Sequence, residues 1–446
     1  MKIDPSFAEE IISQAVKSGA DQAEVFMKSY KNLTVDIKGQ EVDSLTSSLS
    51  YGYGLRVIRN NCLGFAYATD IKEKNSVIKQ AVESAGFSDE DSCLWLPEPS
   101  EPAKIGVYDP AVSDIKEDDA IALTMLLEKS AFDADSRIKK VRKASGSFTT
   151  TETVITNSKA VNTSYLSTAC TAQIMAIAED GIESQTGWDF SGSRFLSDVS
   201  FEKTGRTAAE RSVQLLGART IAGSRTDVIL DNSVAIDFLG IFASSLSSEA
   251  LQKGKSLLQD KLGKAVISPG INIIDSGLRS GKLGSRPVDD EGVPTSETIL
   301  VQEGVLQTYL YNTYTARKGN THSTGNAARG SFSSLPSVGI TNLFIEPPAA
   351  EGCLCKMELF RSLGRGLYIV DAMGVHTANP VSGDFSLGVT GLWIEGGEIQ
   401  FPVKEAVITG NILEFFNKVA ALGDDLIFYG NMGAPSIIIS DVDISA

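Results

Sequence analysis

Histidine is scarce in this sequence, with His322 and His376 the only two among 446 residues. A zinc peptidase holds its ion with two or three imidazoles or carboxylates, and two of the histidines commonly share one helix. Neither histidine here has a helical partner at ligand spacing, so a two-histidine helix site is excluded. Pairing of the two across the fold remains an open alternative to their use as ordinary loop residues.

Cysteine is also scarce and odd in number, at five. Such a count argues against a disulfide framework and for a reducing compartment, which indicates the cytoplasm. Cys353 and Cys355 stand one residue apart, where two thiolates can contact a soft metal or form a strained disulfide. A second cysteine pair for a closed zinc site is missing, so two loop or edge-strand cysteines without chemistry are the favoured interpretation.

Long apolar runs are missing as well. No window approaches 18 consecutive apolar residues, and the first ten residues hold no apolar stretch long enough for a signal peptide. The sequence therefore predicts neither a membrane segment nor a secretory leader.

Basic residues are outnumbered, with 40 Lys and Arg against 56 Asp and Glu and a formal charge of −16. This charge repels phosphate backbones and argues against a nucleic-acid binder. The densest basic run holds Lys139, Lys140, Arg142 and Lys143. Because its apolar residues alternate with these cations, we interpret the run as the solvent-exposed face of a strand.

Apolar periodicity dominates what is present. It predicts a helix over 7–16, then strands, with Asn60-Asn61 as a hairpin turn, and a second helix over 77–85. A proline-rich and acidic stretch over about 87–113 is interpreted as an exposed linker. A helix, alternating segments near 137–179 and a helix over 201–217 then repeat the opening theme.

After about residue 226 the pattern changes to short strands broken by glycine, with helical periodicity over 233–253 and 412–421. We therefore predict an α+β fold rather than a doubly wound parallel sheet. It has an α+β domain over 1–222, for which two similar halves are an alternative description, and a β-rich domain over 223–446 with few helices.

Asp289, Asp290 and Glu291 form the densest acidic cluster. Adjacent carboxylates repel one another, so they either face water or meet cations and backbone amides. A solvated turn is the default interpretation, and the alternative is a cleft that anchors a cation, a metal or a neighbouring loop. Gly325 and Asn326 are further cleft candidates. No phosphate-binding glycine motif or serine-nucleophile motif is present, so no nucleotide cofactor or serine hydrolase is indicated.

Several segments, in order along nearly the whole chain, resemble the TldD/PmbA family, once labelled modulators of DNA gyrase and regarded as a two-subunit peptidase system. They are 19–25, 53–58, 247–254, 289–292, 324–326, 383–386 and 433–436. Within that family the TldD subunit carries H-E-x-x-x-H on a helix, and its histidines bind zinc while its glutamate can act as base. The matching positions here are Ser248, Glu249 and Lys253. A further ligand, a cysteine near the C terminus, matches a place close to Tyr429.

Serine is a poor zinc ligand and a lysine ammonium repels the cation, so the resemblance points to the PmbA branch, also called TldE. It implies a metal-free subunit of a heterodimeric zinc metalloprotease, with zinc only in a TldD-like partner. The implied substrates are peptides and unfolded small proteins, and a homodimer in isolation is possible. Two alternatives stay open: a non-proteolytic modulator that binds gyrase or another protein, and a free-standing peptidase with Glu249 as base beside the acidic cluster.

Overall fold

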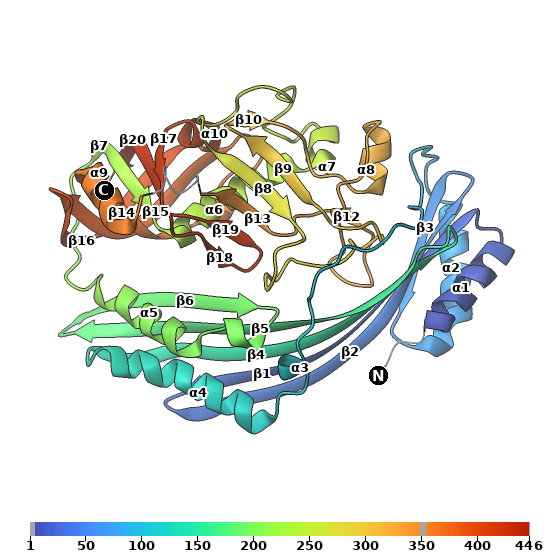
Figure 1. Cartoon of the computed structure of the whole chain (residues 1–446), viewed down its shortest axis with the longest axis horizontal. Coiled ribbons are helices and arrows are strands. Elements are labelled where there is room, and N and C mark those ends of the chain that lie inside the picture. Colours follow the sequence, from blue (N-terminus) through green and yellow to red (C-terminus); the bar gives the residue numbers. More distant parts are fainter. Residues whose placement is uncertain (1–4, 348–353, 446) are drawn as a thin grey trace.

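The computed structural model describes residues 5–347 and 354–445. Its N-terminal half is built on one antiparallel sheet with the strand order β3-β2-β1-β4-β5-β6 (Figure 1). The strands are β1 (Gln22–Lys38), β2 (Glu41–Arg59), β3 (Cys62–Ala68), β4 (Ile138–Asn157), β5 (Asn162–Asp180) and β6 (Glu183–Ser193). Four of them run for 17 to 20 residues, about 55–65 Å of extended chain, which is long for a globular protein.

Tight turns join the first three strands. Asn60 and Asn61 have φ of 51° and 58°, so the predicted hairpin turn is confirmed. Gly39 and Gln40, with φ of 64° and 60°, make a similar turn between β1 and β2. Two successive residues with positive φ match the right-handed twist of the flanking strands, and asparagine and glycine tolerate that conformation.

The two faces of this sheet differ in chemistry. On the outer face, Val25 and Met27 pack in one core with two helices, and Leu33 and Val35 pack in another. The helices of this half are α1 (Pro5–Lys17), α2 (Lys74–Ala85), α3 (Pro110–Ser113), α4 (Glu117–Ala134) and α5 (Phe201–Val213). Figure 1 shows the opposite face, here called the inner face, curving around the C-terminal half.

The segment predicted as a linker contains no helix or strand between α2 and α3. It is not simply exposed, because Leu96 and Val107 are buried. Its backbone bonds to both halves, since Ala103 N donates to Pro287 O and Val107 O accepts from Thr168 N. The domain division near residue 222, and the two similar halves before it, stay predictions, although each half has the order helix, three strands, helix.

Two six-stranded sheets form the C-terminal half, in the orders β10-β9-β8-β13-β19-β18 and β16-β15-β14-β7-β20-β17. The helix α6 (Asn232–Ala243) is apolar almost all round and is buried in their shared core. The strands are β7 (Ser224–Leu230), β8 (Asn272–Ser276), β9 (Glu297–Gln302), β10 (Val305–Leu306), β11 (Ala327–Ala328), β12 (Ser337–Val338), β13 (Leu343–Glu346), β14 (Arg365–Met373), β15 (Asp384–Glu395), β16 (Glu398–Asn411), β17 (Val419–Leu422), β18 (Ile427–Tyr429), β19 (Met432–Ala434) and β20 (Ile437–Ser445). The remaining helices are α7 (Ser248–Gln252), α8 (Thr313–Lys318), α9 (Lys356–Leu363) and α10 (Ile412–Phe416). The predicted α+β class is confirmed.

Two predicted helices are shorter than their periodicity suggested. The stretch 233–253 breaks between α6 and α7 because Ser247 takes an extended conformation and its hydroxyl caps Glu249 N. The stretch 412–421 ends after α10 and continues as β17. No described helix is long and apolar enough to cross a membrane.

The basic run in β4 does not alternate simply. Register shifts between Ile138 and Lys140 and between Val141 and Lys143 mark two bulges in the pairing with β5. Each bulge adds one residue, so pairs of cations are exposed to solvent while Ile138 and Val141 stay buried under the helices of the outer face. The predicted exposure is confirmed and the predicted period of two is wrong.

Candidate functional site

The helix α7 carries the positions that resemble a zinc-binding helix. Ser248 is buried, and its hydroxyl donates to Thr315 Oγ1 at 2.8 Å. Thr315 in turn donates to Asn312 Oδ1 at 2.8 Å, at the start of α8. The serine hydroxyl is therefore held within the protein by a hydrogen bond to a side chain that the sequence did not single out.

Glu249 on α7 and Lys253, which directly follows the last residue of this helix, form an ion pair. Lys253 Nζ lies 2.6 Å from Glu249 Oε1, and Glu249 Oε2 accepts a long hydrogen bond from Val338 N at 3.4 Å. The hydrogen bond from Lys253 is the main cause of a lowered pKa for Glu249. A carboxylate with a lowered pKa is a weaker base, so this arrangement does not suit proton abstraction from water.

These donors do not fit a zinc ion. One is an engaged hydroxyl and another is an ammonium, where zinc takes imidazole, thiolate or carboxylate ligands. Within residues 5–347 and 354–445, no three His, Cys, Asp or Glu side chains gather as a metal site. His322 and His376 are both exposed. The predicted pair of cysteines falls partly outside the described residues, because Cys353 is not among them.

The acidic turn is buried, which corrects the default interpretation of a solvated turn. Asp289 and Glu291 are fully buried and Asp290 is nearly so. Asp289 accepts from the backbone N–H groups of Glu291 and Val293, both at 2.9 Å, and of Ala327 at 3.0 Å. Burial, followed by the charge of Glu291, raises the pKa of Asp289 to about 7. Backbone amides thus take the place that water was expected to fill.

Arginines from both halves of the protein balance the negative charge of this turn. Arg56 on β2 lies 2.9 Å from Glu291 Oε1 and 2.6 Å from Glu24 Oε2, and Glu24 also pairs with Arg329. Burial lowers the pKa of Arg56, but Glu24 and Glu291 outweigh this and raise it. The only sequence signal for this network was that Glu24 and Arg56 alternate with apolar residues along β1 and β2. The same alternation is found in any strand with one solvent-exposed face, so it did not reveal the network.

Gly325 and Asn326 lie against the same turn. Asn326 Nδ2 donates to Asp275 Oδ2 at 2.7 Å, and Ala327, next along the chain, binds Asp289. Gly325 has φ of 74°, and a side chain there would overlap the carbonyl oxygen of Pro294. The structure therefore brings these predicted cleft residues together, and it gives them structural contacts.

A cavity of about 390 Å³ reaches this network from the surface. Arg56, Glu291 and Asn312 line its buried end, and Asp89 and Glu90 are exposed at its rim. Leucine, proline and tyrosine side chains form the walls: Leu63, Leu94, Leu335, Pro336 and Tyr314. Of the predicted cleft residues, Glu291 lines the cavity. Asn312 joins this cavity to Ser248 through the two hydrogen bonds described above.

Tyr429 lies in a different part of the contact between the halves. Its hydroxyl donates to Asp189 Oδ1 at 2.9 Å and accepts from Arg211 Nη2 at 2.9 Å. Arg211 also pairs with Asp231 at 3.1 Å. These partners lie on β6, on α5 and at the start of α6, so the structure does not bring Tyr429 together with the α7 positions. The expected alignment of Tyr429 with a third ligand gains no support from this geometry.

A half-buried pair of carboxylates near this contact predicts a dependence of stability on pH. Burial, and then the charge of Asp371, raises the pKa of Asp237 from 3.8 to about 6. The folded state therefore keeps a proton that the unfolded state loses, and stability falls as pH rises from about 4 to 6. We expect Asp237→Asn to add about 1–2 kcal/mol to the unfolding free energy at neutral pH, after discounting for partial exposure.

Urea unfolding of both proteins below and above this range provides the measurement. The gain from Asp237→Asn should nearly vanish at about pH 4. An equal gain at both pH values would show that the carboxylate charge is not the cause.

Three consecutive family models match the chain. They are described as PmbA/TldA metallopeptidase domain 1 over residues 23–85, the central domain over 110–216 and the C-terminal domain over 223–446. The Metalloprotease PmbA homolog of Haemophilus influenzae is 31% identical over 99% of this chain and 95% of that protein. Metalloprotease PmbA of Escherichia coli O157:H7 is 27% identical over 98% and 96%.

Solved structures agree in fold. A Thermotoga maritima protein described as a candidate modulator of a DNA gyrase has a TM-score of 0.91 at 26% identity, covering 99% of both chains. TldE from Thermococcus kodakarensis has a TM-score of 0.89 at 22% identity, covering 99% of this chain and 100% of that one, and this likeness concerns the fold alone. The family models together span most of the sequence, and the chain therefore belongs to the PmbA/TldD family of metallopeptidases.

Proposed function

We propose that this chain is a PmbA/TldE-type subunit that binds no zinc itself and works with a TldD-like subunit that supplies the ion. The ion pair between Lys253 and Glu249 carries the proposal. It places a positive charge at one expected ligand position and neutralises the carboxylate at the expected base position. The relatives named as metalloproteases support a role in peptide hydrolysis, which we assign to the assembly of two different subunits.

The substrates that we propose are peptides and unfolded small proteins. Short strands such as β11 and β12, close to α7, can offer backbone groups to an extended chain, a binding mode with little side-chain specificity. The cavity beside them combines apolar walls with an acidic rim, which suits an apolar or basic side chain. We place the assembly in the cytoplasm, where the free thiols of Cys62, Cys93, Cys170 and Cys355 stay reduced.

Reconstitution tests the proposal directly. The chain and a TldD-like subunit are purified separately, and cleavage of an unstructured fluorogenic peptide is measured for each alone and for the mixture. We expect activity that depends on zinc in the mixture and none from this chain, since its α7 donors do not fit the ion. Elemental analysis should find zinc only in preparations that contain the partner. An active, zinc-loaded preparation of this chain alone would overturn the proposal.

Glu249 provides a second readout of the same proposal. We expect Glu249→Gln in this chain to leave the rate of the mixture within about twofold, because its carboxylate is held by Lys253 and has no part in the chemistry. The matching substitution at the glutamate of the partner's H-E-x-x-x-H motif is the control, and it should abolish cleavage. A large loss from the change at Glu249 would favour a catalytic role for this residue.

A further inference from the structure

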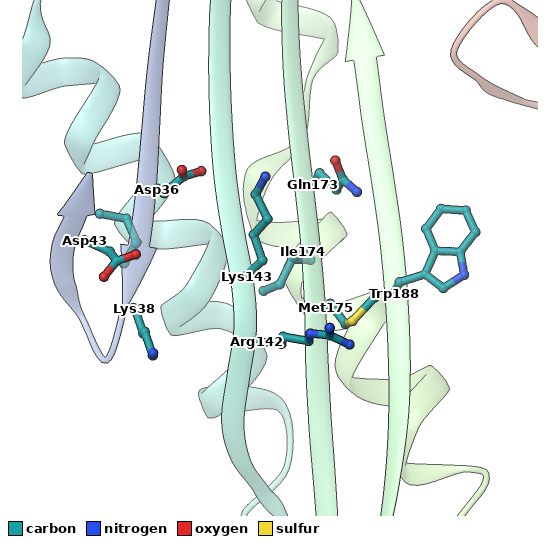
Figure 2. Close-up of a pocket in the computed structure, with 10 residues that line it drawn as sticks. Asp36, Lys38, Asp43, Arg142, Lys143, Gln173, Ile174, Met175 and Trp188 are labelled. Carbon is teal, nitrogen blue, oxygen red and sulfur yellow. The ribbon is translucent and has the colours of Figure 1, made fainter. Parts of the chain in front are cut away.

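A groove on the inner face of the N-terminal sheet is separate from the α7 site. It crosses β1, β4, β5 and β6, has Asp43 of β2 at its edge, and encloses about 620 Å³ (Figure 2). Figure 2 shows Lys143 between Asp36 and Gln173, and Arg142 extending across β5 toward Met175. Lys38, Asp43 and Trp188 complete its charged and aromatic lining.

The cations that line this groove are Lys38, Arg142 and Lys143. Among the residues that the structure describes, Lys38, Arg142 and Lys143 make no ion pair, whereas Lys140 on the same strand is 3.1 Å from Glu179. Unpaired cations gathered in one groove are unexpected in a chain of net charge −16, where carboxylates are available to pair with them. Their free state favours a ligand with negative charge.

A β-bulge brings two of these cations to the same face of the sheet. In a regular strand Arg142 and Lys143 would point to opposite faces, but the bulge between Val141 and Lys143 turns both toward the groove. At the other end of the groove, Trp188 is fixed by the C-terminal half. Its ring packs against that of Tyr429 in an edge-to-face arrangement, with the ring centroids 5.4 Å apart.

The lining distinguishes a peptide from a phosphate polymer. Asp36 and Asp43 stand among the three cations, and they would repel a chain with a charge on every unit. Gln173 offers an amide for backbone groups, while Met175 and Trp188 offer apolar contact. We propose that the groove binds acidic segments of the peptide substrates, with Lys143 and Arg142 contacting their carboxylates. This inference rests on the proposed function for the source of the peptide.

The same face leads from the groove toward the C-terminal half. Two residues further along β1 from Asp36, Thr34 begins a polar cluster in which Ser147 and Thr149 donate to Asn32 Oδ1 at 2.9 and 2.7 Å. The face is then covered where Phe26 packs with Val288, next to the acidic turn. The eleven residues from Asp36 to Phe26 span about 33 Å of strand, enough for an extended peptide of similar length.

Binding to the isolated full-length chain tests the inference. The probe is a fluorescently labelled, glutamate-rich octapeptide, and its version with glutamine at every glutamate is the comparison. We expect Lys143→Ala and Arg142→Ala each to weaken binding about two- to fivefold, and the triple change with Lys38→Ala at least tenfold. Lys139→Ala, an exposed lysine outside the groove on the same strand, should change nothing. The affinity for the glutamate peptide should fall with added salt.

Several outcomes would overturn the inference. They are equal binding of the two peptides, an equal loss from Lys139→Ala, displacement of the peptide by inorganic phosphate at equal charge, or tighter binding of a DNA oligonucleotide. Because the assay needs neither zinc nor a partner, it is independent of the reconstitution test. In an active mixture, Lys143→Ala should raise KM for the glutamate peptide alone. Loss of peptide binding when the partner is added would instead assign the groove to a segment of the partner.

Discussion

Arg56→Met is expected to lower the unfolding free energy by about 3–5 kcal/mol. The side chain is 8% exposed and holds two fully buried carboxylates, those of Glu24 and Glu291. Its removal leaves Glu291 without a cationic partner, while Glu24 keeps Arg329. A buried charge that has lost its partner costs far more than an exposed ion pair contributes. Urea unfolding followed by fluorescence measures the change.

Two further variants separate charge from packing. Arg59→Ala removes an exposed arginine three residues along the same strand, and we expect a change within about 0.5 kcal/mol. Adding Glu291→Gln to Arg56→Met removes the orphaned charge and should recover part of the loss. If Arg56→Met alone stays within about 1 kcal/mol of the natural protein, the buried network contributes little to stability.

Gly325→Ala is expected to cost about 3–4 kcal/mol. The φ of 74° alone costs an alanine about 1–2 kcal/mol. The new methyl group would also overlap the carbonyl oxygen of Pro294, and relief of such an overlap costs about 1–3 kcal/mol more. Because Ala327 binds Asp289, displacement of this loop should also disturb the acidic turn.

Gly263→Ala is the matched control for this change. Gly263 has the same φ of 74°, but no atom lies within 4 Å of the position that a methyl group would take. It should therefore show only the conformational cost of about 1–2 kcal/mol. Equal losses in the two variants, measured by urea unfolding, would remove the overlap with Pro294 as a cause.

Local sequence patterns predicted the fold class and many of the helices and strands. Apolar alternation and turn residues determine the backbone conformation of residues that are close together in sequence. Asn60-Asn61 is one example, since its conformation depends on the two strands beside it. The prediction of one continuous helix over 233–253 was wrong. Apolar periodicity carries no information about the hydroxyl of Ser247, which caps the first turn of α7 and so separates it from α6.

The candidate site was less predictable because its contacts join distant parts of the chain. Whether Asp289 and Glu291 face water depends on Arg56, which is 235 residues from Glu291 in sequence. Tyr429 was aligned by its place in the sequence, whereas its partners on β6 and α5 come from the first half of the chain. The pairing of Glu249 with Lys253 follows from helical spacing and was within reach of the sequence.

The separation of Glu24 from Arg329 has a consequence during synthesis. The two residues are 305 positions apart in sequence. At a translation rate of about 5–20 residues per second, Arg329 is therefore added roughly 15–60 s after Glu24. During that interval the hairpin of β1 and β2 can form, with Arg56 already beside Glu24. Until Arg329 is made, this part of the sheet carries charged side chains on its inner face, and we expect them to disfavour aggregation of the growing chain.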